Sequence, residues 1–229
     1  MSRKKREAEF LSIVKAVEDH LLEVRETGIE EIPPAFNIVP SVKLCQTLDE
    51  IREWIGDCQR CKLSPTRTQI VFGNGSSGPA LVFVGEGPGA EEDAQGKPFV
   101  GRAGQLLTKM IEAMGLTREE VFITNVVKCR PPGNRNPEAE EIAACSPFLK
   151  NQLKVLKPRI ICTLGTFASQ TLLKTEEKIS KLRGRFYSYE GMLLMPTYHP
   201  AYLLRNPAEK KSAWEDIQMI MKELNLKKT

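Results

Sequence analysis

Short apolar runs alternate with longer stretches of helical periodicity over most of the chain. The apolar runs, each of which predicts a strand, cover residues 69–72, 80–84, 121–127, 160–164 and 192–196. Apolar residues at helical spacing predict helices at about 102–115, 137–156, 165–174 and 208–225. Apolar strands that alternate with helices are typical of a parallel sheet covered on both faces. We therefore expect an α/β fold, a three-layer α/β/α domain with a central parallel sheet.

The beginning of the chain follows a different pattern. Apolar residues recur at helical spacing over Lys5–Arg25, which predicts an amphipathic helix. Residues 28–46 contain three prolines and little periodicity, which indicates a linker. A short helix is expected over about 48–58, with Thr47 as its N-cap.

The chain is therefore divided into two parts, an N-terminal extension of residues 1–55 and a main domain of residues 56–229. Charge separates nearly the same parts: residues 1–56 carry 8 basic and 11 acidic side chains, whereas residues 57–229 carry 25 and 18. A net charge of +7 on the main domain favours a polyanionic partner without naming one. The extension is expected to dock on the main domain, on a second copy of the chain or on a partner protein.

Composition excludes several classes of protein. Hydrophobic residues make up 41% and charged residues 27%, as in an ordinary globular protein. No apolar run approaches the ~20 residues that cross a bilayer. Glu7 and Glu9 stand where a signal peptide requires an apolar stretch. We expect a cytoplasmic protein with no membrane partner.

Four of the six cysteines form a candidate metal site. Cys58 and Cys61 make a Cys-x-x-Cys pair, Cys129 follows a predicted strand, and Cys145 lies on a predicted helix. The pair alone is also compatible with a redox motif or with two free thiols. Four thiolates suit zinc and an iron–sulfur cluster equally, so spacing leaves the metal open. Cys162, in an apolar run, is interpreted as a core residue.

Three unusual loops follow predicted strands and indicate one site, because ligands of parallel sheets bind beyond the carboxyl ends of strands. The loops are GEGPG at 85–89, RPPGN at 130–134 and PTYHP at 196–200. The first lacks the Gly-Lys-Ser/Thr of a P-loop, is too short for a dinucleotide fingerprint, and is followed by acids that would repel a triphosphate.

Three side chains near these loops are candidate ligand contacts. Phe99 is either a core residue or a stacking platform for a ring. Asn125 either ties a loop down or reads a base edge through its carboxamide. His199 is one of only two histidines and lies just beyond a predicted strand.

Longer motifs around these residues strongly resemble the family 4 uracil-DNA glycosylases, the iron–sulfur members of their superfamily. They are VGEGPGAEEDAQGKPFVGRAGQLL, TNVVKCRPPGNRNP and LMPTYHPAYLLR, in that order along the chain. The resemblance covers about residues 56–223 and leaves residues 1–55 outside it.

The resemblance implies a monofunctional enzyme that excises uracil from single- or double-stranded DNA and leaves an abasic site. It implies a [4Fe–4S] cluster as cofactor. It also assigns residues to roles: Cys58, Cys61, Cys129 and Cys145 to the cluster, Glu86 and Gly87 to the first catalytic motif, His199 to the second, Phe99 to stacking on uracil and Asn125 to its polar edge.

Chemistry adds further expectations. The target nucleotide must leave the duplex, and an apolar side chain, Leu203 or Leu204, would fill the vacated space while Arg205 holds phosphate. Arg130 and Arg135 flank the second loop and are expected to contact DNA. Water would attack the sugar carbon, so no lysine nucleophile and no strand nicking are expected.

Two positions depart from the better-known family 1 enzymes. Gly87 stands where those enzymes carry an aspartate that assists the water, so Glu86 is the candidate helper if its side chain faces the pocket. Gly89 stands where they carry a tyrosine that excludes thymine. We expect Glu92 to fill that volume, held by Asn134.

Three alternatives compete with this interpretation. The first is an iron–sulfur DNA-binding or replication-associated protein without hydrolase activity, and the second is a glycosylase for another deaminated base. The third, a relative that traps DNA through a histidine in an inserted basic loop, is disfavoured because the chain continues from Val100 directly into GRAGQLL.

Overall fold

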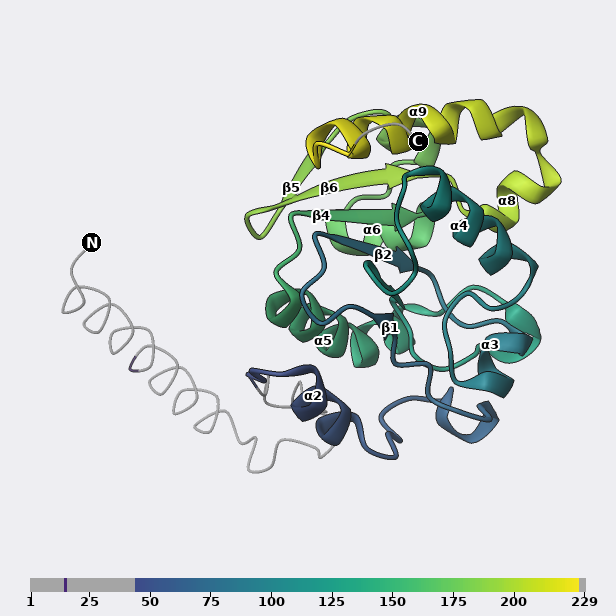
Figure 1. Ribbon diagram of the computed structural model, residues 1–229. Helices are drawn as coiled ribbons and strands as arrows, with labels where there is room; N and C mark the ends of the chain where they lie inside the picture. Colours follow the sequence, from purple (N-terminus) through teal and green to yellow (C-terminus); the bar gives the residue numbers. More distant parts are fainter. Residues whose placement is uncertain (1–14, 16–43, 227–229) are drawn as a thin grey trace, which may run out of the picture. The chain divides into compact units, whose positions relative to one another are not determined.

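The computed structural model describes Lys15 and residues 44–226, and the chain falls into two compact units, Met1–Val42 and Lys43–Thr229 (Figure 1). The helix predicted over Lys5–Arg25, apart from Lys15, and most of the predicted linker lie outside the described residues. None of the helices within the described residues is both long enough and apolar enough to cross a membrane.

The second unit is built on a six-stranded mixed sheet of order β1-β3-β2-β4-β6-β5. Its strands are β1 (Asn74–Gly75), β2 (Leu81–Gly85), β3 (Phe122–Asn125), β4 (Ile160–Leu164), β5 (Tyr187–Tyr189) and β6 (Met192–Thr197). The four central strands are parallel, and the two edge strands pair antiparallel with their neighbours. The α/β class is therefore confirmed, with a parallel centre and antiparallel edges.

The edge strands are where the predicted pattern and the structure differ. Residues 69–72 form no strand; Val71 donates one backbone hydrogen bond to Lys128, and the edge strand begins only at Asn74. Strand β5 was not predicted, because it is three residues long, none of them buried, and contains no apolar run. It joins β6 through Glu190 and Gly191, which both have positive φ, as a tight two-residue hairpin requires.

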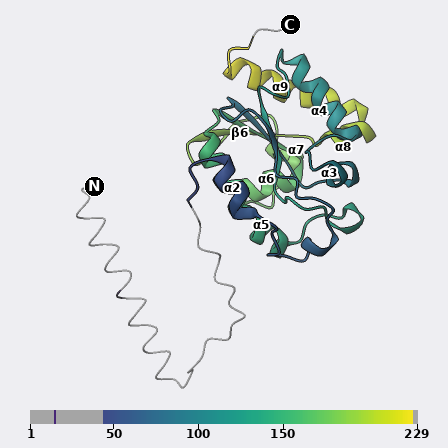
Figure 2. The same ribbon diagram turned by 60° about the horizontal axis from the view of Figure 1, so that its bottom comes forward.

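Alternate side chains of the central strands enter two separate cores, which makes the unit three layers thick. In β2, Leu81 and Phe83 pack on one side, and Val82 and Val84 on the other. The first side is covered by α4 (Arg102–Ala113) and α9 (Lys210–Glu223), and the second by α2 (Leu48–Ile55), α5 (Ala139–Leu156) and α6 (Thr166–Leu173) (Figures 1 and 2). The three-layer α/β/α prediction is confirmed.

Helix α2 packs beside α5 through the buried side chains of Ile51 and Ile55 (Figure 2). Thr47 caps it as predicted, because its Oγ1 accepts a hydrogen bond of 3.1 Å from the Glu50 amide. The domain boundary after residue 55 stays a prediction, since these contacts describe only the last residues of the predicted extension.

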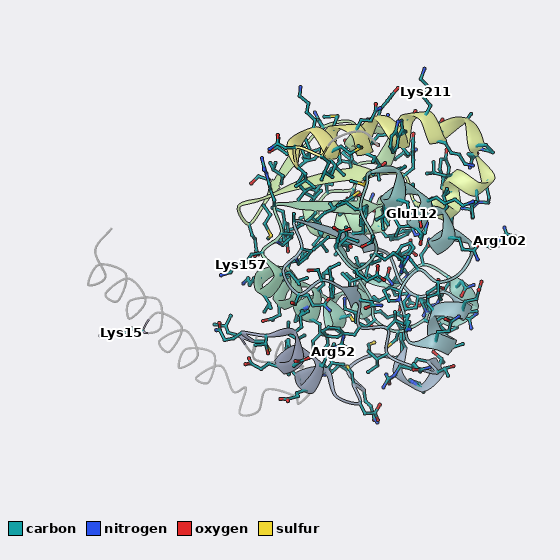
Figure 3. The ribbon with its side chains drawn as sticks, viewed as in Figure 1. Lys15, Arg52, Arg102, Glu112, Lys157 and Lys211 are labelled. Atoms are coloured by element: carbon teal, nitrogen blue, oxygen red, sulfur yellow. The ribbon has the colours of Figure 1, made fainter. Side chains whose placement is uncertain are left out.

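Charged side chains of the covering helices point outward. Arg102 and Glu112 on α4 and Lys211 on α9 lie at the surface (Figure 3). Three short helices, none of them predicted, complete the fold: α3 (Ala90–Gln95), α7 (Ile179–Leu182) and α8 (Pro200–Arg205). Helices α3 and α8 begin in the loops that follow β2 and β6, so they bring the sequence motifs to one edge of the sheet.

Candidate active site

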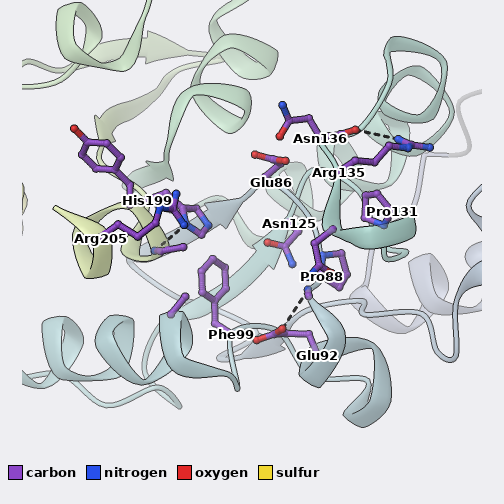
Figure 4. Close-up of a pocket in the computed structure, with 16 residues that line it drawn as sticks. Glu86, Pro88, Glu92, Phe99, Asn125, Pro131, Arg135, Asn136, His199 and Arg205 are labelled. Carbon is purple, nitrogen blue, oxygen red and sulfur yellow. Dashed lines mark hydrogen bonds between the residues drawn. The ribbon is translucent and has the colours of Figure 1, made fainter.

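A cavity of about 430 Å³ opens at the carboxyl ends of β2, β3 and β6; we call it the edge cavity. All three predicted loops contribute to its wall (Figure 4). Its lining includes eight of the predicted site residues: Glu86, Gly87, Glu92, Phe99, Asn125, Arg135, His199 and Arg205. The cavity also has a polar wall and an apolar wall, which suits a flat heteroaromatic ring.

The Phe99 ring forms the apolar wall, and its centroid lies 5.7 Å from that of His199 at an interplanar angle of 34°. Gly85, the last residue of β2, permits this arrangement. A Cβ atom on Gly85 would lie 2.6 Å from the Phe99 ring and 2.4 Å from Asn125 Oδ1. The glycine therefore lets the ring and the carboxamide meet at the floor of the cavity.

Asn125, the last residue of β3, supplies a polar group without a partner. Its side chain is 1% exposed, and within the described residues its Oδ1 is one of two buried side-chain atoms with no hydrogen bond. An unpaired buried carbonyl costs about 1–3 kcal/mol. Because the carboxamide lies on the edge cavity beside Phe99, a bound ligand with an N–H group would satisfy it (Figure 4).

The Phe99 backbone is held in an unusual conformation, with φ at +53°. Such a conformation costs about 1–3 kcal/mol in a non-glycine residue and persists only where its surroundings enforce it. The enforcing group is the Glu92 carboxylate, which accepts hydrogen bonds from the Val100 and Gly101 amides at 2.9 Å and from the Gly89 amide at 3.1 Å. Glu92 therefore ties the Phe99 loop to the first motif.

This finding corrects the expected partner of Glu92. Asn134 does not hold it; the Asn134 side chain accepts a hydrogen bond of 2.7 Å from Arg130 Nε instead. The three backbone amides already occupy the Glu92 carboxylate, and it still lines the edge cavity. Sequence spacing did not show this bonding because the donors are backbone groups.

His199 is held in one tautomer by the helix that it begins. As N-cap of α8, its Nδ1 accepts a hydrogen bond of 3.1 Å from the Ala201 amide. A neutral imidazole whose Nδ1 accepts must carry its proton on Nε2. Burial, with a smaller contribution from Arg205, lowers the pKa of His199 to about 4. The neutral ring is therefore a hydrogen-bond donor to the edge cavity at physiological pH.

Glu86 faces the same space from the loop after β2 (Figure 4). Burial raises the pKa of its carboxyl from the usual 4.5 to about 7. A carboxyl that titrates near neutrality is suited to general acid–base chemistry. The condition placed on Glu86, that its side chain face the pocket, is met.

The rim of the edge cavity separates the two leucines of α8. Leu203 is 1% exposed and packs against Tyr198 and Ala213, so it is unavailable to a partner in this structure, whereas Leu204 is 37% exposed. Arg205 lines the cavity.

The two arginines of the second loop are both engaged within the protein. Arg135 lines the edge cavity but is paired in bidentate fashion with the buried Glu141, at 2.6 and 2.9 Å. Arg130 does not line the cavity. Their contact with DNA stays a prediction.

Six cavity-lining residues had no predicted role there: Pro88, Ala103, Pro131, Asn136, Ala201 and Tyr202. Asn136 comes from the run GNRNP, whose second asparagine was the available signal. The prolines have no polar group to mark them. Tyr202, placed beside the predicted opening, stacks on Tyr198 with ring centroids 5.0 Å apart.

A second cavity brings together the four predicted cysteine ligands; we call it the thiol cavity. Nitrogen donors approach three of the sulfur atoms. Arg60 Nη1 lies 3.3 Å from Cys58 Sγ, the Lys128 amide 3.3 Å from Cys145 Sγ, and Arg67 Nη1 3.7 Å from Cys129 Sγ. In the described part of the chain, no three metal-ligating side chains are close enough together for a single metal ion.

Comparison with known proteins agrees with these features. The model of the Uracil DNA glycosylase superfamily matches residues 72–218. The chain is 48% identical over 189 residues to a Type-4 uracil-DNA glycosylase of Saccharolobus solfataricus, covering 79% of this chain and 88% of the relative. It is 46% identical to a protein of the same name from Sulfurisphaera tokodaii (76% and 83% covered) and 44% identical to one from Thermotoga maritima (76% and 92%).

Proposed function

Since this chain belongs to the uracil-DNA glycosylase superfamily, and within it to the type-4 enzymes, we propose that it excises uracil from DNA. The reaction is hydrolysis of the N-glycosidic bond, which leaves an abasic site for DNA repair. The observation that carries the proposal is the unpaired Asn125 Oδ1, buried on a cavity beside an aromatic ring. Such a group suits a site that binds the polar edge of a base.

The nucleotide must first leave the stack, because the edge cavity lies within the protein and the target carbon lies within the duplex. Leu204 is the exposed apolar side chain of α8 and is our candidate wedge for the vacated space. Arg205, at the end of the same helix, is placed to hold a phosphate. Flipping costs a few kcal/mol, less for a mismatched or single-stranded base.

Recognition of uracil follows from the two walls of the edge cavity. The Phe99 ring stacks on the base, and Asn125 accepts a hydrogen bond from N3–H and donates one to O4. Cytosine presents the opposite pattern at these atoms, so it would leave buried groups unpaired on both sides. The excision rate for cytosine should therefore be far below that for uracil, as expected of a site whose polar groups bond the edge of one base.

His199 assists departure of the base. Cleavage of the glycosidic bond through an oxocarbenium-like sugar places negative charge on the leaving uracil. The Nε2–H group of the neutral imidazole donates to uracil O2 and stabilises that charge. A preorganised donor of this kind is typically worth about 3–4 kcal/mol. Because the pKa of His199 is about 4, the ring remains neutral while it acts.

Glu86 activates the water that attacks the sugar carbon. Its pKa near 7 makes the carboxylate a stronger base than an ordinary glutamate. The lining of the edge cavity contains no lysine among the described residues, which supports release of an intact abasic strand without Schiff-base chemistry. Thymine exclusion by Glu92 stays part of the proposal, because the clamped carboxylate lines the cavity.

The thiol cavity would hold a [4Fe–4S] cluster on Cys58, Cys61, Cys129 and Cys145. Two observations fit this group. The four cysteines line one cavity, and a nitrogen donor approaches each of three of their sulfur atoms, which would stabilise an anionic cluster. When bound, the cluster would cross-link the loop at 58–61 to the segment that follows β3 and to α5. A cytoplasmic location, where thiols stay reduced, remains a prediction.

The deciding experiment treats a uracil-containing oligonucleotide with the holoenzyme, then with alkali. We expect cleavage only after alkali, and none for the matched cytosine strand. Asn125→Ala should lower the single-turnover rate by about 10²-fold or more, whereas Asn74→Ala, on the exposed edge strand β1, should not change it. A wild-type protein that releases no uracil would refute the proposal.

A further inference from the structure

Lys128 is a buried lysine that the proposed excision of uracil does not use. It is 2% exposed and lies three residues after Asn125. Its Nζ is 2.7 Å from each of three oxygens, namely Thr124 Oγ1, the Asn125 carbonyl and Gln152 Oε1. Three acceptors match the three hydrogens of an ammonium group. Burying an amino group this completely is costly unless it is hydrogen-bonded, so the position calls for an explanation.

The bond to the Asn125 carbonyl bears directly on the edge cavity. Asn125 is the last residue of β3, and its Oδ1 has no partner of its own. The direction of the carboxamide therefore depends on how the backbone at Asn125 is held. On one side the next amide, Val126, donates to the Gly85 carbonyl at 2.9 Å. On the other side Lys128 Nζ donates a hydrogen bond to the carbonyl of Asn125 itself.

The other contacts of Lys128 anchor it to α5. Gln152 Oε1 accepts from Nζ, while Gln152 Nε2 donates to the Phe72 carbonyl at 2.9 Å. The Lys128 amide donates to Cys145 Sγ, two turns earlier on α5. Lys128 therefore contacts both cavities. Its side chain donates to the Asn125 carbonyl, and its backbone amide donates to the sulfur of Cys145.

We propose that Lys128 is a positioning residue for uracil recognition: the hydrogen bonds of its Nζ fix the end of β3 against α5, so that the Asn125 carboxamide is presented to the base edge. This inference rests on the proposed excision of uracil. It differs from a general contribution to folding because its effect passes through a single side chain, that of Asn125.

A double-mutant cycle tests the proposal. Lys128→Met keeps the apolar stem and removes the donors, and it is made both in the wild-type protein and together with Asn125→Ala. In the wild-type background the single-turnover excision rate should fall by about ten- to a hundredfold. In the Asn125→Ala background the same change should cost less than about threefold, because the side chain being positioned is gone.

A binding measurement separates positioning from damage to the fold. Affinity for a duplex with a stable abasic-site analogue needs no base recognition, so Lys128→Met should leave it within about twofold of wild type. Bound iron and the unfolding midpoint are measured on the same samples. Thr124→Val removes one acceptor of Nζ while keeping side-chain shape, and serves if Lys128→Met does not fold. It should show a smaller loss of rate that again requires Asn125.

Asn151→Leu is the matched control. Asn151 is 2% exposed on α5, next to Gln152, but bonds the Cys45 amide and the Pro147 carbonyl instead of Asn125. Any loss that it causes should be equal in both backgrounds. Equal losses for Lys128→Met in both backgrounds, or equal weakening of abasic-site binding, would overturn the inference while leaving uracil excision in place. A wild-type protein without uracil release would overturn both.

Discussion

The edge cavity and the thiol cavity are both attached to the segment that follows β3, yet they treat their polar atoms in opposite ways. The edge cavity leaves the Asn125 Oδ1 unpaired and raises the pKa of Glu86 by burial. In the thiol cavity, donors approach the sulfurs of Cys58, Cys129 and Cys145. The first pattern suits a ligand that binds and leaves, and the second suits a resident anionic group. Changes in the two cavities should therefore affect different properties of the protein.

The largest effect should come from Glu86→Gln, which removes the proposed base. We expect a fall in the single-turnover rate of about 10²- to 10⁴-fold. For the wild type, the rate should rise with pH through about 7, because the base acts in its ionised form and burial holds its pKa there. His199, with a pKa of about 4, should add no second inflection above pH 5. The measurement is single-turnover excision between pH 5 and 9.

Glu91→Gln is the control for this change, since Glu91 is an exposed acid of the neighbouring helix α3. Its rate and pH profile should match the wild type. A Glu86→Gln protein that keeps a rate inflection near pH 7 would assign that titration to another group.

Next in size is Cys145→Ser, which should act on the cofactor and the fold. We expect loss of bound iron and a fall in the unfolding midpoint of about 10 °C, because a cross-link between α5 and the segment that follows β3 is lost. Iron content, sulfide content and visible absorbance near ~400 nm report the cluster. Cys162→Ala is the matched control, because Cys162 is fully buried in β4 and lies outside the thiol cavity. The Cys162→Ala protein should keep its bound iron. Full iron content in Cys145→Ser would remove that cysteine from the ligand set.

Arg67→Gln should have an intermediate effect. The Arg67 guanidinium bonds the Cys58 carbonyl and the Asp57 carboxylate, both at 2.6 Å, and approaches Cys129 Sγ. Its loss should lower the unfolding midpoint by about 5 °C and speed bleaching of the cluster in air. The initial excision rate should stay within about twofold of wild type. Arg60→Gln, which removes a more exposed donor, should change both stability measures less; the reverse order would contradict this assignment.

The smallest expected effect is a gain of stability in Glu86→Gln. The folded-state pKa of Glu86 lies above its usual 4.5, so ionisation is disfavoured in the folded protein. This penalty is fully present above pH 7 and absent below about pH 4.5. The variant should be more stable at pH 8 by about 1 kcal/mol, allowing for solvent screening, and no more stable at pH 4.5. Denaturant unfolding at the two pH values measures the difference, and an equal gain at both would rule out this cause.

The sequence predicted the parts of the fold that apolar periodicity controls. Strand β4 occupies Ile160–Leu164 as predicted, and the three loops meet at one edge because parallel strands end there. Strand β5 could not be predicted from the sequence, because its residues lie at the sheet edge, are not buried and form no apolar run. Helices α3 and α8 could not be predicted from hydrophobic periodicity, because each is too short for apolar residues to repeat at helical spacing.

The candidate site was predictable where function depends on side-chain identity. The aromatic ring of Phe99, the carboxamide of Asn125 and the imidazole of His199 each indicate a kind of ligand contact from residue type alone. The structure brings all three to one cavity. What sequence reasoning missed depends on backbone partners: the three amides that bind Glu92 and the Ala201 amide that fixes His199. Sequence reasoning also could not choose between Leu203 and Leu204 as the wedge. Adjacent residues of a helix face different directions, but which of them faces solvent depends on how the helix packs.

The left-handed backbone of Phe99 has a consequence for how this protein can change. A Cβ atom on Gly104 would lie 1.9 Å from the Phe99 carbonyl oxygen, so any larger residue at position 104 must displace the backbone at Phe99. Residue 104 contributes no chemistry, yet its substitution should disable the site as thoroughly as loss of the ring. In a deep mutational scan the two positions should behave as one unit, with a Gly104→Ala background masking most further substitutions of Phe99.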